Sequence, residues 1–312
     1  MHFNTIRRII KITPAFKLIK ASRKIVIPGF EGLSFYLVTK FFFKGLQNGA
    51  LNMRATSLAF SFFLALFPTI IFLFTLIPYI PIDDFNAYLF GLLQKMMPAA
   101  AFEATESTIT DIISNKKGGL LSIGFFTALY FSTNGFNAMI NAFNETYHEI
   151  ETRKPLQQRL ISLYMLFLTV ILMSVSIAIL IYSEFGFRQI KLNNKSFYYI
   201  LSIFKWIVLF GMFYAIISFN YFLGPKRKQG WRFFSAGSMF ATVFIIIATM
   251  GFAYYVNNFG NYNKLYGSIG TLIVIMMMIY INSLILLLGF DLNVSILSAK
   301  KHKDLFKHVR IR

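Results

Sequence analysis

LYGSIGTLIVIMMMIYINSLILLLGFDLNVSILSA, residues 265–299, is a stretch of the chain with a single charged residue, Asp291. A helix that crosses a bilayer needs about 20 mostly apolar residues, and this stretch is longer than that. Backbone polar groups in lipid must form hydrogen bonds within their own segment, which favours a helix over an isolated strand. The stretch therefore predicts a transmembrane helix.

Five further regions are equally poor in charge. Four of them have no charged residue, and the fifth, 196–225, contains Lys205. They cover residues 55–82, 118–144, 160–183, 196–225 and 233–263. A membrane β-barrel would instead show short segments of alternating polarity. The sequence therefore predicts an all-α, polytopic integral membrane protein with six transmembrane helices, in one domain over residues 55–299.

The composition excludes an ordinary soluble protein. Hydrophobic residues make up 56% of the chain and charged residues 14%, against about 25% charged residues in soluble domains. A net charge of +19 on so apolar a chain indicates contact with anionic phospholipid rather than nucleic acid. The chain has no cysteine, which excludes disulfides and thiolate metal sites. We expect no cofactor and no bound metal.

The distribution of Lys and Arg predicts the orientation, because cytoplasmic loops hold the excess of these residues. The N-terminal region 1–54, the tail 300–312 and the loops after the second and fourth helices carry most of them. Both termini are therefore expected in the cytoplasm.

Amphipathic helices are expected outside the membrane-spanning segments. Residues 84–114 show helical periodicity of apolar side chains, and they either cover the outer end of the protein or form a lid over a cavity. On the inner side, lysines share helical faces with aromatic and aliphatic residues. Such faces are typical of interfacial helices on anionic lipid. The alternative is that the lysines act only as a topology signal. These lysines are Lys17, Lys20, Lys24, Lys40 and Lys44.

The second predicted helix carries a polar stripe on one face, because its polar residues recur every three or four positions. Amides facing lipid would be unfavourable, so the stripe must face other helices or water. One interpretation is hydrogen bonding between helices, and the other is the lining of a translocation path. The amides of this stripe are Asn134, Asn137, Asn141 and Asn144.

The sixth predicted helix places Asn282 and Asn293 on one face and Asp291 on a neighbouring strip. An intramembrane carboxylate is by default a candidate functional group. Asp291 either pairs with an inner-face cation or takes a proton-coupled or ligand-binding role. The candidate cations are Arg54, Arg153 and Arg159.

Two other features are candidates for function. Pro68 near the centre of the first helix predicts a kink, which suits either a broken-helix binding site or a static packing feature. The connection 257–268 is expected to be an outer loop that binds a neutral polar headgroup or forms a compact turn. Its candidate residues are Asn258, Tyr262, Asn263 and Tyr266.

Short motifs in the second half of the chain resemble the YihY/BrkB family of bacterial inner-membrane proteins, once labelled ribonuclease BN. They are YVNNF at 255–259, YGSIG at 266–270 and LLLGFDLN at 286–293. Short motifs earlier in the chain also resemble the family pattern, and the similarity covers about residues 30 to 298. The chain departs from the family pattern at Phe60 and Ala65, where the family commonly has Tyr and Ser, and at Asp291, where Glu is common.

The resemblance implies a multi-pass protein of the bacterial inner membrane, together with a virulence-factor and a nuclease label. Three functions follow: a transporter or flippase-like protein for a lipid or other amphiphile, a non-transporting organiser of the envelope, and a membrane-associated ribonuclease. The polar stripe, the proline and the basic inner face favour the first, whose partners are membrane lipids and which is not an enzyme. A homo-oligomer is compatible with the sequence.

The topology is testable with reporter fusions. A reporter fused after Arg312 should stay cytoplasmic, and one inserted within residues 83–117 should lie outside, because an odd number of spans separates them. Reporters found on the same side would contradict the six-span arrangement.

Overall fold

The computed structural model describes most of the chain. The described residues are 25–26, 29–48, 50–76, 118–146, 153–193, 195–226, 233–259 and 262–309. The amphipathic helices predicted over 84–114 lie outside these ranges, as do Lys17, Lys20 and Lys24.

The described residues form seven helices, and the predicted all-α class is confirmed. They are α3 (Phe35–Asn48), α4 (Leu51–Leu76), α7 (Gly118–Thr146), α8 (Pro155–Asn193), α9 (Lys195–Leu223), α10 (Ala236–Phe259) and α11 (Tyr262–Val309).

Five of these helices are long and apolar enough to cross a membrane, namely α4, α8, α9, α10 and α11. Helix α7 has 29 residues, which is about 43 Å at a rise of 1.5 Å per residue. Its glycines and asparagines leave it without a segment as apolar as those of the other five. The chain is thus a multi-pass membrane protein, whereas the sixth span and the cytoplasmic position of both termini stay predictions.

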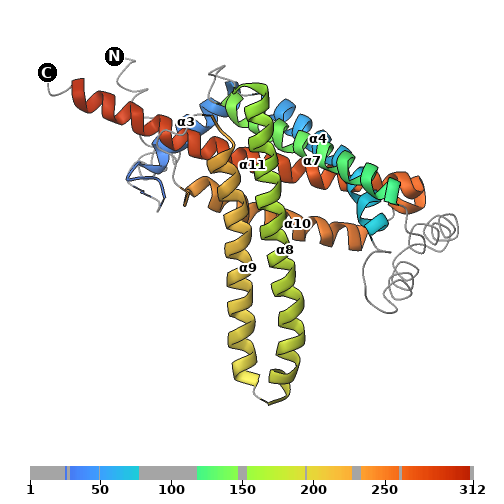
Figure 1. Cartoon of the computed structure of the whole chain (residues 1–312). Coiled ribbons are helices and arrows are strands. Elements are labelled where there is room, and N and C mark those ends of the chain that lie inside the picture. Colours follow the sequence, from blue (N-terminus) through green and yellow to red (C-terminus); the bar gives the residue numbers. More distant parts are fainter. Residues whose placement is uncertain are drawn as a thin grey trace.

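The helices do not form one parallel bundle (Figure 1). Helices α4, α7, α10 and α11 form a group in which α4 packs along α7 and α11 packs against α4 and α10. Helices α8 and α9 form a hairpin that extends away from this group at a large angle. The hairpin joins the group through contacts of α8 with α7 and of α9 with α10.

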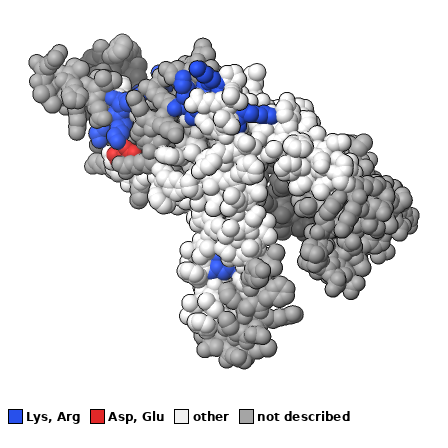
Figure 2. Space-filling view, in the orientation of Figure 1, with Lys and Arg blue, Asp and Glu red and all other residues white. Residues whose placement is uncertain are grey.

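Basic side chains gather at one end of the hairpin and along the C-terminal part of α11 (Figure 2). The visible surface of the hairpin beyond that end is almost free of charge. Its exposed side chains are mostly large and apolar, as in Ile171, Ile200 and Phe204. Such a surface is stable in lipid and would be an aggregation site in water.

The core lies where α7, α9 and α11 meet. Phe143 stacks on Phe290 with ring centroids 4.1 Å apart, and Tyr221 packs edge-on against both rings at 5.5 Å. All three side chains are almost completely buried. The Tyr221 hydroxyl donates to the Leu286 carbonyl, so this core also satisfies its buried polar atom.

Helix α3 has the amphipathic character predicted for its lysines. Val38 is buried in a small cluster with Ile296 and Ala299 of α11, while Lys40 and Lys44 are exposed. The helix therefore lies on α11 with its basic residues facing outward, as an interfacial helix would.

Three boundaries differ from those expected. The connection expected over 257–268 is shorter than predicted, because α10 continues to Phe259 and α11 begins at Tyr262. Its place on the outer side and its binding role stay predictions. Asparagine and tyrosine have only moderately lower helix propensities than alanine, so they do not end a helix by themselves. Helix α11 also continues into the predicted tail, to Val309. Helix α4 is continuous through Pro68, and the kink expected there, with both of its interpretations, stays a prediction.

Small residues allow α10 and α11 to cross closely. A Cβ atom at Gly237 would collide with the Gly289 carbonyl, and one at Gly289 would lie 2.6 Å from the Gly237 carbonyl. Ala241, one turn after Gly237, also faces Gly289. Small residues four positions apart are typical of closely packed membrane helices.

We predict that Gly237→Ala lowers the free energy of unfolding by about 1–3 kcal/mol, since overpacking forces the two backbones apart. Gly251→Ala on the same helix is the matched control, because nothing lies within 4 Å of its added Cβ. It should be neutral or stabilising by up to about 1 kcal/mol. Unfolding of the detergent-purified protein measures both changes, and equal effects would contradict the close crossing.

Candidate functional site

A buried ion pair joins α4 to α11. Arg54 Nη2 donates to Asp291 Oδ2 at 3.0 Å, and Nη1 lies 3.4 Å from Oδ1. The two side chains are only 3% and 4% exposed. Helix α7 completes the cluster, because Thr146 Oγ1 donates to Asp291 Oδ1 at 2.8 Å and Arg54 Nη1 donates to the Ala142 carbonyl at 3.0 Å. The start of α4, the end of α7 and the middle of α11 are therefore tied together by one charge cluster.

The other two arginines proposed as partners of Asp291 lie elsewhere. Arg153 donates to the carbonyls of Gly224 at 2.6 Å and of Pro225 at 2.7 Å. These carbonyls follow the last turn of α9, where a cation is favourable. Partial burial lowers the pKa of the Arg153 guanidinium below its ordinary value.

The amides of the polar stripe on α7 contact the first turns of α8. Gln158 Nε2 donates to Asn137 Oδ1 at 2.5 Å and to Asn141 Oδ1 at 2.7 Å. Arg159 Nη1 donates to Asn134 Oδ1. These are the hydrogen bonds between helices that the first interpretation of the stripe expects. The translocation path along the stripe stays a prediction.

The remaining candidate asparagines have different surroundings. Asn144 Oδ1 accepts from the backbone N–H of Lys226 at 3.0 Å. Asn293 Oδ1 accepts from the Gly237 N–H at 2.7 Å, so this side chain supports the crossing of α10 and α11. Asn144 Nδ2 and Asn282 Oδ1 are buried, and the described residues offer them no hydrogen-bond partner. Asn282 and Asn293 thus do not join the charge cluster around Asp291.

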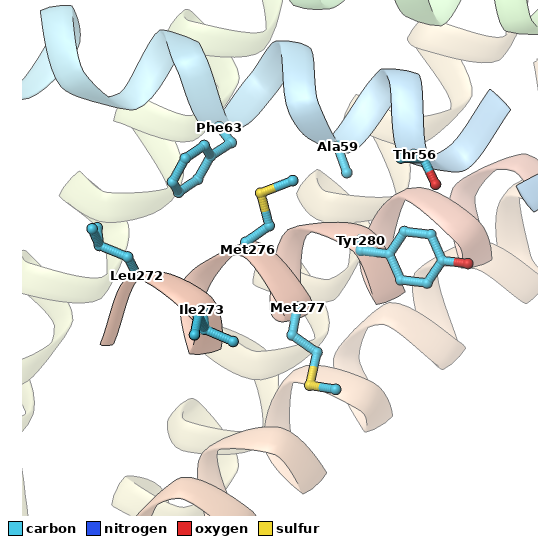
Figure 3. Close-up of a pocket in the computed structure, with 8 residues that line it drawn as sticks. All are labelled: Thr56, Ala59, Phe63, Leu272, Ile273, Met276, Met277 and Tyr280. Carbon is cyan, nitrogen blue, oxygen red and sulfur yellow. The ribbon is translucent and has the colours of Figure 1, made fainter. Parts of the chain in front are cut away.

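A cavity of about 410 Å³ lies between α4 and α11 (Figure 3). Its residues are Thr56, Ala59, Phe63, Leu272, Ile273, Met276, Met277 and Tyr280. The hydroxyls of Thr56 and Tyr280 lie together at one end, and Phe63 and Leu272 lie at the other. This groove, called the α4–α11 groove below, is therefore lined by apolar surface, and two hydroxyl groups lie beside one end.

Comparison with known proteins identifies the family. The model of the family described as "Virulence factor BrkB" matches residues 42–310. The chain belongs to the BrkB family. This confirms the resemblance seen in the short motifs. No solved structure matches the chain.

Relatives of this BrkB-family protein carry two kinds of name. It is 33% identical to the ribonuclease-like protein YfkH of Bacillus subtilis, over 80% of this chain and 92% of YfkH. It is 25% identical to the UPF0761 membrane protein NTHI0384 of Haemophilus influenzae, over 80% and 91% of the two chains. A UPF0761 membrane protein of Vibrio campbellii is 24% identical, over 87% and 84%.

Several residues of the BrkB-family protein were missed at the level of sequence. Gln158 is a polar residue in the first turn of an apolar helix, and that position was a usable signal. Thr146 ends α7, but a single threonine gives no signal of its own. The α4–α11 groove is lined by residues that resemble any other apolar span, so periodicity alone does not reveal it. The backbone of Asn258, Tyr262, Asn263 and Tyr266 is helical, and their side chains lie outside the description.

Within the described residues, no group of three or more His, Cys, Asp or Glu side chains is placed to hold a metal ion. Asp291 is surrounded instead by Arg54 and Thr146. The chemistry of this cluster is therefore ion pairing and hydrogen bonding.

We predict that Asp291→Asn lowers the free energy of unfolding by about 3–5 kcal/mol, since it leaves the Arg54 charge buried without its counter-charge. The double change Arg54→Met with Asp291→Leu should cost much less, because no buried charge remains. Chemical unfolding in detergent measures both.

The control is Glu31→Gln, which breaks the more exposed pair of Glu31 with Lys300. It should cost less than about 1 kcal/mol. A double variant as unstable as Asp291→Asn would show that the charges themselves are not the source of the effect.

Proposed function

We propose that this BrkB-family protein is a transporter-like or flippase-like protein for a lipid or other amphiphile, and that the α4–α11 groove holds the apolar chain. The observation that carries this proposal is the apolar lining of the groove, with two hydroxyl groups beside one of its ends. Its exposed lining is hydrocarbon, thioether and aromatic ring, and the hydroxyl groups of Thr56 and Tyr280 lie beside one end. An amphiphile has the same distribution of polar and apolar groups along its length.

The lining suits chains of variable shape. Met276 and Met277 are unbranched and flexible, and such side chains adapt to irregular apolar ligands. The volume of about 410 Å³ falls within the range of small-molecule pockets, about 300–1,000 Å³. The hydroxyls of Thr56 and Tyr280 can each donate a hydrogen bond to the polar head and accept one from it.

The buried ion pair supports this role by holding the two helices of the groove. Arg54 precedes Thr56 on α4, and Asp291 follows Tyr280 on α11. A fixed inner end leaves the outer parts of α4 and α11 free to separate around a ligand. This arrangement gives the ion pair a positioning role and gives the groove the binding role.

A nuclease function is not part of the proposal, although one relative has a ribonuclease-like name. Metal-dependent nucleases need clustered carboxylates, and this chain scatters 12 acidic residues over 312 positions. A non-transporting organiser of the envelope remains the competing function, since it would also need a stable, lipid-covered fold.

Filling the groove tests the proposal. We predict that Ile273→Trp lowers the rate of transbilayer movement of a fluorescent phospholipid in proteoliposomes about tenfold. The indole would exclude about two methylene groups of the chain, each contributing about 0.8 kcal/mol. Quenching of the label in the outer leaflet measures the rate.

Ile247→Trp on α10 is the matched control, because Ile247 is similarly exposed and is not part of the groove. It should leave the rate unchanged. Wild-type protein that moves no lipid would favour the organiser, and equal losses in both variants would remove the groove from the proposal.

A further inference from the structure

We propose a second lipid site, in which Arg159 binds the phosphate of an anionic phospholipid on the outside of the contact between α7 and α8. This site lies apart from the α4–α11 groove and does not depend on the function proposed for the groove.

The first argument is charge. The ion pairs of the described residues join Arg54 to Asp291 and Lys300 to Glu31. Within that part of the chain, no carboxylate pairs with Arg159, and its partners are neutral. A charged side chain in a membrane-spanning segment is costly without a counter-charge. Arg159 lies within the candidate span Pro155–Leu180, so an anion beside it is favourable.

The second argument is geometry. Arg159 Nη1 donates to Asn134 Oδ1, and Nη2 lies 3.4 Å from the Tyr130 carbonyl oxygen. The guanidinium carbon also lies 4.7 Å from the centroid of the Tyr130 ring. A guanidinium has five N–H donors, so these contacts hold the group in place and leave donors for a ligand. Arginine binds phosphate through two parallel hydrogen bonds.

The third argument is the apolar surface beside the arginine. Leu156, Leu160 and Tyr164 follow each other at four-residue intervals on one face of α8, and they are 75%, 59% and 57% exposed. Tyr130 is also exposed, at 56%. A lipid whose phosphate binds Arg159 can lay an acyl chain along this face. Tyrosine is enriched at the level of the lipid headgroups, which places the phosphate at the same depth.

These observations favour a phospholipid over a free phosphate ion. A free ion would gain the hydrogen bonds of Arg159 and nothing from the exposed leucines. An anionic phospholipid gains both, and it is abundant in the cytoplasmic leaflet. Arg159 begins the apolar part of α8 on the side where the basic loops lie, so the proposed lipid belongs to that leaflet.

The test titrates phosphatidylglycerol and, separately, phosphatidylcholine into the full-length protein in neutral detergent, with bound lipid counted by native mass spectrometry. We expect Arg159→Gln to weaken phosphatidylglycerol binding about tenfold, as for the loss of a charge-assisted hydrogen bond. Arg159→Lys should weaken it similarly, because lysine keeps the charge but loses the planar donor pair. Phosphatidylcholine carries the same phosphate together with a cationic choline, so it should bind more weakly than phosphatidylglycerol and lose less affinity in each variant. An unchanged unfolding temperature shows that each variant is folded.

Lys154→Gln is the matched control. Lys154 is an exposed cation five residues before Arg159, and its substitution removes the same charge. It should weaken binding less than Arg159→Gln does. Tyr130→Leu keeps the surface apolar and should weaken binding about threefold through the lost ring contact. Equal effects of Lys154→Gln and Arg159→Gln, or wild-type binding by Arg159→Lys, would overturn the site in favour of general surface charge. Displacement of phosphatidylglycerol by soluble glycerol phosphate would overturn the lipid in favour of a free phosphate ester.

Discussion

The ion pair between Arg54 and Asp291 is the interaction on which the arrangement of the helices depends. A charge buried this deeply is tolerated only with its counter-charge and with hydrogen bonds to the remaining donors and acceptors. Thr146 and the Ala142 carbonyl of α7 supply those hydrogen bonds. Helices α4, α7 and α11 therefore cannot separate at this point without exposing a charge to an apolar medium.

Packing around this pair explains the rest of the helix group. The aromatic core of Phe143, Tyr221 and Phe290 adds α9 to α7 and α11. The crossing at Gly237 and Gly289 adds α10 at close range, with Asn293 as its hydrogen-bond acceptor. In lipid, hydrophobic burial gives little drive for helices to associate, so close packing and hydrogen bonds carry that task. Both are concentrated at the end of the protein where the basic residues lie.

The two proposed lipid sites use the two kinds of surface that this arrangement leaves. The α4–α11 groove arises because the helices are tied at one end while their apolar faces do not fill the space between them. The Arg159 surface arises because the hairpin of α8 and α9 leaves the helix group at a large angle. That angle exposes Leu156, Leu160 and Tyr164, which a parallel bundle would partly cover.

The sequence by itself determined the class of protein and the type of each element. Long uncharged segments such as 265–299 must be helical in lipid, because no water is present to bind their backbone. It also identified Asp291 and the amides of α7 as groups that need partners. Only the tertiary structure decided which partners they have. Arg54, Arg153 and Arg159 have the same charge and similar positions beside apolar spans, so pattern alone does not separate them. Their different contacts depend on helix crossings and on contacts between residues as far apart as Arg54 and Asp291, and periodicity within a segment carries no information about either.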